Sequence, residues 1–195
     1  MEIVRTPEER FAQVPDFPWE PVYREWEGMR LAHVDEGEGE PVLLVHGEPT
    51  WGFLWRKVMG PLLDAGYRCI VPDLPGFGRS DKPARAGDYS YRHHVLWMNA
   101  WLAALDLDGV TMFCQDWGSL IGLRMVADAP DRFDRVVLAN GGLPTGTTPL
   151  PRAFLIWRAF SRWSPWFPIG RIVKAGCARG LGERECGTAR RDPQG

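Results

Sequence analysis

The sequence has no paired cysteines, no signal peptide and no long apolar run, and each absence excludes a class of protein. Its four cysteines form neither a C-x-x-C pair nor a zinc-type spacing, which favours reduced thiols in a cytoplasmic protein and predicts no metal site. The N-terminal residues lack the apolar stretch of a signal peptide, and no run could span a bilayer. The net charge of −2 gives no reason to expect nucleic acid or a membrane as a partner.

Internal repeats and low-complexity segments are also missing, and the composition is that of a globular protein. Hydrophobic residues make up 45% of the 195 residues and charged residues 25%, so the chain could bury a sizeable core. Ten tryptophans are many for this length, and several of them lie near the motifs described below.

Apolar runs typical of buried strands alternate along the chain with amphipathic stretches typical of helices. This alternation predicts an α/β fold with a mostly parallel sheet and helices on both faces. The expected strands cover residues 21–26, 29–34, 41–45, 68–71, 110–113 and 135–139, and the expected helices cover 53–63, 91–105 and the stretch from 120 onward.

Composition changes after residue 140 and predicts three segments. Residues 1–147 form the core, beginning with a polar surface arm over residues 1–20. Residues 148–180 contain an aromatic, helix-prone block over residues 154–173, which we interpret as the beginning of a helical lid. Residues 181–195 have no periodicity and almost no apolar side chains, so we expect a disordered tail.

The stretch from Gly109 to Gly122 joins a β-prone run directly to a helical pattern. Such a turn needs small residues, because strand and helix approach each other closely, and Cys114, Gly118 and Ser119 supply them. Asp116 occupies the tip. It could be an ordinary helix N-cap, or it could be the nucleophile of a small-x-nucleophile-x-Gly elbow with aspartate in place of serine.

Three blocks in a fixed order favour the second interpretation. His46-Gly-Glu-Pro and Asp73-Leu-Pro-Gly-Phe-Gly-Arg-Ser80 each follow a predicted strand, and Gln115-Asp-Trp-Gly118 forms the elbow. Together they resemble α/β-hydrolases with an aspartate nucleophile, haloalkane dehalogenases in particular. The shorter matches Arg5-Thr-Pro7 and Ser80-Asp-Lys-Pro83 extend the resemblance, which covers about residues 1–180.

The resemblance implies that Asp116 displaces halide from a saturated carbon and becomes an alkyl ester, with a small haloalkane and water as substrates and no metal or organic cofactor. An aspartate suits this step because its carboxylate is ionised at neutral pH without a neighbouring base. The resemblance further implies an oxyanion hole from the backbone N–H groups of Glu48 and Trp117, a structural role for His46, and a monomer for the intact fold.

The leaving halide needs donors that carry no negative charge, and indole N–H groups qualify because they only donate. In the family one such tryptophan follows the nucleophile, which here is Trp117. A second comes from the lid, where Trp157 is our match and Trp163 and Trp166 are alternatives; simple lid packing is the competing interpretation of Trp157. The Glu48 side chain could also face the halide, or it could be an ordinary solvated loop acid.

The C-terminal part departs from the family pattern. Such hydrolases place the acid and the catalytic histidine after the lid, yet no histidine follows His94. The acids after Asp116 lie at a helix end or in the polar tail, so none is placed to orient a base. We therefore expect a fold that lacks its last strands and most of the lid. A frameshift or early stop near residue 180 is our hypothesis for this loss. We also expect the chain to be impaired in catalysis or inactive.

Two other functions compete with dehalogenation. Epoxide hydrolysis also uses an Asp-Trp elbow, but that family activates the epoxide with lid tyrosines, and all four tyrosines here precede Asp116. The other competitor is a non-catalytic fragment, because the base is missing and the strand at residues 135–139 would be left as an unprotected sheet edge.

Overall fold

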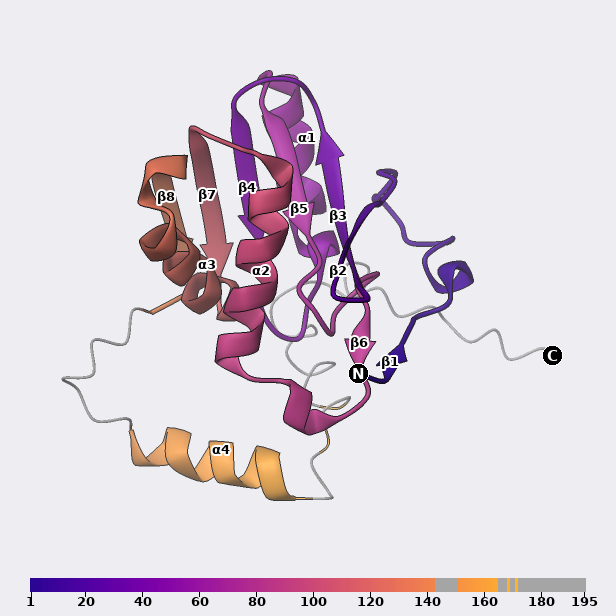
Figure 1. Ribbon diagram of the computed structural model, residues 1–195, viewed down its shortest axis with the longest axis vertical. Coiled ribbons are helices and arrows are strands. Elements are labelled where there is room, and N and C mark those ends of the chain that lie inside the picture. The colour runs from indigo at the N-terminus through magenta and orange to yellow at the C-terminus, as the bar shows by residue number, and fades with distance from the viewer. Residues whose placement is uncertain (143–150, 165–167, 169–170, 172–195) are drawn as a thin grey trace. The chain divides into compact units, whose positions relative to one another are not determined.

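The computed structural model describes residues 1–142, 151–164, 168 and 171, which belong to two compact units, Met1–Leu143 and Pro144–Gly195. The first unit holds every described strand and all but one of the described helices (Figure 1). Its strands are β1 Ile3–Val4, β2 Val22–Trp26, β3 Met29–Glu36, β4 Pro41–Val45, β5 Arg68–Pro72, β6 Lys82–Pro83, β7 Val110–Gln115 and β8 Phe133–Ala139. Its α-helices are α1 Arg56–Asp64, α2 Tyr91–Leu105 and α3 Trp117–Asp128, and its 3-10 turns are η1 Glu8–Arg10, η2 Gly52–Trp55, η3 Ala86–Asp88 and η4 Pro130–Arg132.

The main sheet has six strands in the order β2-β3-β5-β4-β7-β8. The neighbouring pairs β5–β4, β4–β7 and β7–β8 are parallel, and β2 and β3 run antiparallel at one side. The predicted α/β fold with a mostly parallel sheet is therefore confirmed. Because parallel strands end at the same edge, the loops that follow β4, β5 and β7 come together there.

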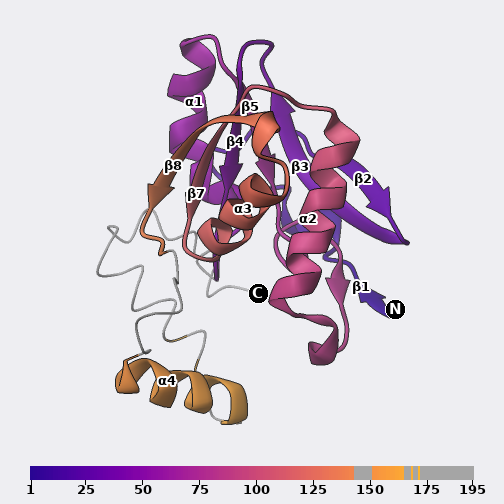
Figure 2. The ribbon, with the colours of Figure 1, turned by 60° about the vertical axis from the view of Figure 1, so that its left-hand side comes forward.

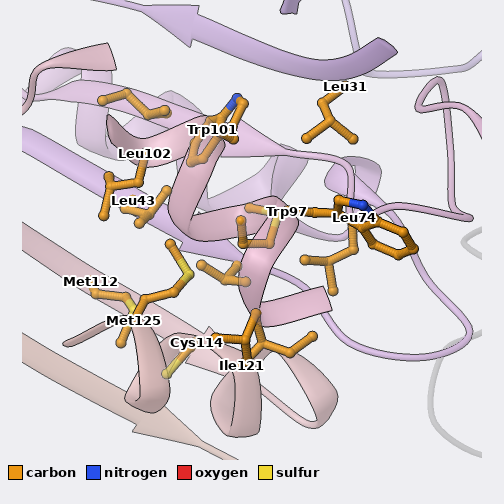
Figure 3. Close-up of a cluster of buried hydrophobic side chains, with 14 of the residues drawn as sticks. Leu31, Leu43, Leu74, Trp97, Trp101, Leu102, Met112, Cys114, Ile121 and Met125 are labelled. Atoms are coloured by element: carbon orange, nitrogen blue, oxygen red, sulfur yellow. The ribbon is translucent and has the colours of Figure 1, made fainter. Parts of the chain in front are cut away.

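Helices cover both faces of this sheet, as the strand pattern requires. Helix α1 lies on one face of the sheet, and α2 and α3 lie on the other (Figure 2). Leu43 and Val45 of β4 pack with α2 and α3, whereas the alternate residues Val42 and Leu44 pack with α1. All four side chains are at most 4% exposed, which explains why β4 is apolar without alternation. Figure 3 shows the larger of the two clusters, where Trp101 of α2 lies with leucine and methionine side chains.

The histidine in β3 has the structural role expected from the sequence. His33 is 2% exposed, and its Nδ1 accepts a hydrogen bond from the indole N–H of Trp101 at 3.3 Å. Burial lowers the pKa of His33 to about 4, so the ring is neutral at neutral pH and can accept this bond.

The N-terminal arm is tied to the sheet more firmly than a surface arm would be. β1 pairs with β6, and the Arg5 guanidinium donates two hydrogen bonds to the buried carboxylate of Asp81, at 2.8 and 3.0 Å. Phe17 is only 7% exposed and belongs to the cluster under α1. The arm therefore contributes part of the core, because its aromatic side chain is inserted beneath the helix.

Strand β8 lies at the end of the sheet order, as expected for residues 135–139, and begins two residues earlier than predicted. Three consecutive side chains, Val136, Val137 and Leu138, are 40–45% exposed on this strand. The expectation that this strand forms a sheet edge is confirmed within the described residues.

In the second unit the structure describes one α-helix, α4, over Arg152–Trp163. It begins two residues before the helix-prone block expected over residues 154–173, and residues 143–150 and the expected tail 181–195 fall outside the described residues. None of the described helices is long and apolar enough to cross a membrane. No group of three or more potential metal ligands occurs among the described residues.

Candidate active site

The turn between β7 and α3 holds Asp116 in a backbone conformation that non-glycine residues rarely adopt. Its φ is 53° and its ψ is −125°. Such a conformation costs on the order of 1–3 kcal/mol and persists only where the surroundings hold it in place. Here the carbonyl oxygen of Asp116 accepts both the Ser119 N–H, at 3.0 Å, and the Ser119 hydroxyl, at 2.6 Å. The strand therefore turns into the helix within one strained residue.

This geometry turns the Asp116 side chain away from the helix. Asp116 makes no side-chain capping hydrogen bond to α3. Instead its Oδ1 accepts the backbone N–H of Glu48, in the loop after β4, at 2.9 Å. The interpretation of Asp116 as an ordinary side-chain N-cap is thus wrong, because the positive φ directs the carboxylate across to the neighbouring loop.

Two glycines permit the close approach of these elements. A side-chain carbon added to Gly47 would lie 2.4 Å from Asp116 Oδ1, and one added to Gly118 would lie 2.3 Å from the carbonyl oxygen of His46. Gly118 is thus needed at the start of α3 because the helix touches the backbone at the end of β4. The expectation of small residues around the turn is confirmed.

His46 fixes the loop after β4 and is not available as a base. Its Nε2 accepts the Leu74 N–H at 2.9 Å, so the ring proton lies on Nδ1, which contacts the Gly47 carbonyl at 3.0 Å. The side chain is fully buried, and burial lowers the pKa of His46 to about 4. These contacts support the structural role that the resemblance implied.

Asp73 joins the loop after β4 to the loop after β5. Its Oδ1 accepts the Gly52 N–H and its Oδ2 accepts the Arg79 N–H, each at 2.7 Å. Complete burial raises the pKa of Asp73 to about 6, although both hydrogen bonds oppose this shift. The two loops that follow neighbouring strands are therefore held together by one carboxylate.

A cleft of about 370 Å3 opens beside these loops. Trp117, the first residue of α3, lies in its wall and is 41% exposed, while Glu48 lines the cleft from the loop after β4. Desolvation and the neighbouring charge of Asp116 raise the pKa of Glu48, although part of the residue is exposed. The lining is completed by Leu74, Gly76, Phe77, Tyr89, Ser90, Tyr91, His94 and Ile121.

The cleft contains side chains that the sequence did not single out. Tyr89, Tyr91 and His94 come from the end of η3 and the first turn of α2, which runs along the cleft. His94 was expected to be exposed, but it is half-buried in this wall. Since two of the four tyrosines line the cleft, their position before Asp116 in the chain does not argue against epoxide chemistry. The Ser90 N-cap was the available signal, because it places the start of α2 next to the loop after β5.

The four histidines differ in what they could do. His33 and His46 are buried and hydrogen-bonded, and His93 is exposed with Nδ1 at 2.7 Å from the Asp88 carbonyl. His94 lines the cleft, yet its Nδ1 lies 3.0 Å from the Ser90 carbonyl and its Nε2 lies 3.2 Å from the Pro75 carbonyl. With both nitrogens directed at backbone oxygens, the His94 ring presents no lone pair to the cleft.

The tryptophans that the sequence analysis assigned to a lid belong to the second unit. Trp157 lies on α4 with 52% of its surface exposed, next to Phe154 at a ring separation of 5.9 Å. Trp163 ends the same helix and is 78% exposed. Trp166, the remaining alternative, falls outside the described residues. The site that the structure brings together therefore consists of Asp116, Glu48 and Trp117.

A sheet with this strand order and an aspartate at the strained strand-to-helix turn are typical of the α/β-hydrolase fold. The family model described as alpha/beta hydrolase fold matches residues 40–168, and the chain belongs to this family. The chain is 51% identical over 186 residues to a haloalkane dehalogenase of Mycolicibacterium paratuberculosis, with 92% of the chain and 62% of that relative covered. The predicted resemblance to haloalkane dehalogenases is thereby confirmed, and the chain spans about 62% of that relative's length.

Solved structures of both enzyme classes resemble the chain, to different degrees. The tetrameric haloalkane dehalogenase of Paraglaciecola agarilytica matches with a TM-score of 0.86 and 36% identity, over 95% of this chain and 64% of that one. An epoxide hydrolase of Vigna radiata matches with a TM-score of 0.58 and 29% identity, over 62% of this chain and 38% of that one. The chain is thus more similar to the dehalogenase than to the epoxide hydrolase.

Proposed function

We propose that the chain cleaves the carbon–halogen bond of small haloalkanes by forming an ester on Asp116. The observation that carries the proposal is the Asp116 carboxylate, which a strained backbone turns away from its own helix and toward the Glu48 N–H, beside Trp117 in the cleft wall. Similarity to haloalkane dehalogenases over 92% of the chain supports this choice of leaving group. Haloalkane and water are the substrates, and no metal or organic cofactor takes part.

The two carboxylate oxygens of Asp116 have different roles in this proposal. Oδ1 already accepts the Glu48 N–H, whereas Oδ2 has no hydrogen-bond partner among the described residues. Oδ2 attacks the carbon, a C–O bond forms, and the halide leaves with the electrons of the C–halogen bond. Oδ1 then becomes the ester carbonyl oxygen, which remains next to the Glu48 N–H. The Trp117 N–H is the second donor to this oxygen, because N–H groups of a first helical turn have no partner within the helix.

The leaving halide is stabilised by donors without negative charge. The Trp117 indole N–H supplies one from the cleft wall, and Trp157 stays the prediction from the resemblance for the other donor. The Glu48 side chain, which lines the same cleft, is the further group that the resemblance allows to face the halide.

The substitution Trp117→Phe should raise the dissociation constant for bromide about tenfold, because a hydrogen bond to an anion is worth more than one between neutral groups. Thermal stability should change little, since the side chain is 41% exposed. Isothermal titration calorimetry and thermal melts measure the two effects, with Trp26→Phe on β2 as the matched control. A large drop in melting temperature with unchanged bromide affinity would show that Trp117 serves packing instead.

Hydrolysis of the ester requires a base that activates water. The chain has four histidines, and the one in the cleft directs both ring nitrogens at backbone carbonyls. The chain of 195 residues should therefore react once with 1-bromobutane and stop. We expect one butyl group per chain, found by mass spectrometry on the peptide that contains Asp116, and one bromide released.

Two outcomes would contradict this expectation in different ways. Continued bromide release over many turnovers would mean that another group activates water. The absence of any adduct on protein that unfolds cooperatively on heating would contradict the proposed function itself and favour the non-catalytic interpretation. Epoxide opening remains the second candidate because Tyr89 and Tyr91 line the cleft, and styrene oxide in the same assay separates it from dehalogenation.

A further inference from the structure

The cleft beside Asp116 is not uniformly apolar. Leu74, Phe77 and Ile121 give it the apolar character that a haloalkane needs, but the segment from Tyr89 to His94 adds hydroxyl and imidazole groups. A hydrocarbon chain makes no use of such groups. The polar side chains are therefore the groups to examine for contacts with a part of the substrate other than the carbon–halogen bond.

Among the hydroxyl groups of this segment, that of Tyr89 is the one without a hydrogen-bond partner in the part of the chain that the structure describes. The Tyr91 hydroxyl donates to the Leu120 carbonyl at 3.0 Å, and Ser90 Oγ accepts the His93 N–H at 3.1 Å as the N-cap of α2. Both nitrogens of His94 lie against backbone carbonyls. No acceptor for the Tyr89 hydroxyl occurs among the residues that the structure describes.

The Tyr89 ring is held in place by the loop after β5. A side-chain carbon added to Gly76 would lie 2.7 Å from a ring carbon of Tyr89 and 3.2 Å from its hydroxyl oxygen. Gly76 has a φ of 94°, and both Gly76 and Tyr89 line the cleft. The His94 ring, with its centroid 6.0 Å away, limits movement on another side. These two neighbours restrict the movement of the Tyr89 ring.

Its chemistry is that of a neutral donor. Burial and the charge of Asp88 raise the pKa of Tyr89, so the phenol remains protonated throughout the range in which the Asp116 carboxylate could act. A hydroxyl donor in the wall of a largely apolar cleft favours ligands that present an oxygen to that donor. It also penalises isosteres that do not, because the donor then loses its hydrogen bond to water.

We propose that Tyr89 is a specificity-determining residue, and that the preferred substrates are haloalkanes carrying an ether or hydroxyl oxygen, which accepts a hydrogen bond from the Tyr89 hydroxyl. This inference rests on the proposed function, since it concerns the substrate of the same site. The oxygen of the substrate binds at Tyr89 while the carbon that bears the halogen faces Asp116. No proton is transferred, so the bond making and breaking at Asp116 are unchanged.

The test compares two bromides with the same number of non-hydrogen atoms, 2-bromoethyl methyl ether and 1-bromobutane. The rate of Asp116 alkylation is measured for each, by mass spectrometry, in the 195-residue chain and in its Tyr89→Phe variant. The ratio of the two rates gives the preference for the ether in each protein, and comparing this ratio between the two proteins removes the intrinsic difference in reactivity between the bromides. We expect the preference for the ether to fall about fivefold in Tyr89→Phe, the value for one neutral hydrogen bond. Tyr67→Phe, in the turn before β5, is the matched control and should leave the preference unchanged.

Non-covalent binding gives a second measurement that does not depend on Asp116 chemistry. The dissociation constant of 1,2-dimethoxyethane, measured by ligand-observed NMR, should rise about fivefold in Tyr89→Phe and stay constant in Tyr67→Phe. If bromobutane alkylates Asp116 but neither measurement responds to Tyr89→Phe, the inference is overturned and the proposed function stands. If neither bromide alkylates the chain, the proposed function fails, and an unchanged affinity for the diether then overturns the inference as well.

Discussion

Asp116→Asn should abolish ester formation with 1-bromobutane, lowering the rate at least a thousandfold, because a neutral amide is a very poor nucleophile toward saturated carbon. The fold should survive. The Asp116 side chain does not cap α3, and an amide oxygen can accept the Glu48 N–H in the same place as Oδ1. Mass spectrometry of the peptide containing residue 116 and a thermal melt measure the two effects on the same sample.

The matched control is Asp128→Asn, the same chemical change at the other end of α3. Asp128 forms an ion pair with Arg124 at 2.9 Å and accepts a hydrogen bond from Asn99 at 2.8 Å, and it does not line the cleft. That variant should retain alkylation at Asp116. Adduct formation near the wild-type rate in Asp116→Asn, in a sample verified to be free of deamidation, would mean that another residue is the nucleophile.

Sequence patterns predicted the parts of the fold in which burial alone sets the residue type. The bounds expected for β4, residues 41–45, and for α2, residues 91–105, are those of the structure, because β4 is buried on both faces and α2 starts at a serine N-cap. The elbow could be predicted as well. Close approach of α3 to the end of β4 excludes side chains at positions 47 and 118, and this exclusion is visible in the sequence as glycine.

Other features of the site could not be predicted in this way. The direction of the Asp116 carboxylate depends on a positive φ, and an aspartate before Gly-Ser is equally typical of a capping residue. Tyr89 and His94 lie at a helix start, where a sequence pattern indicates exposure. They reach the cleft because Asp73 and Gly76 shape the loop after β5, which forms part of the cleft wall. These contacts join residues far apart in the sequence, so no periodic pattern in the sequence indicates them.

Gly118→Ala should be strongly destabilising, reducing the free energy of unfolding by at least about 3 kcal/mol. The added carbon would lie 2.3 Å from the His46 carbonyl oxygen and 2.5 Å from that of Val45. Both are backbone atoms in or next to a central strand, so neither can move without disturbing the pairing of β4 with β5 and β7. The alternative is for α3 to move outward, which would carry Asp116 away from the Glu48 N–H.

Two other Gly→Ala changes separate this steric effect from helix propensity. At Gly60 in α1 an added carbon meets nothing within 4 Å, so alanine should stabilise the helix by up to about 1 kcal/mol. At Gly122 in α3 the contact, at 2.7 Å, is with the flexible side chain of Met112, which can shift, so the loss should be intermediate. Urea denaturation of the three variants measures the order. If Gly118→Ala were as stable as Gly60→Ala, α3 would not pack against the end of β4, and the strained placement of Asp116 would lose its structural cause.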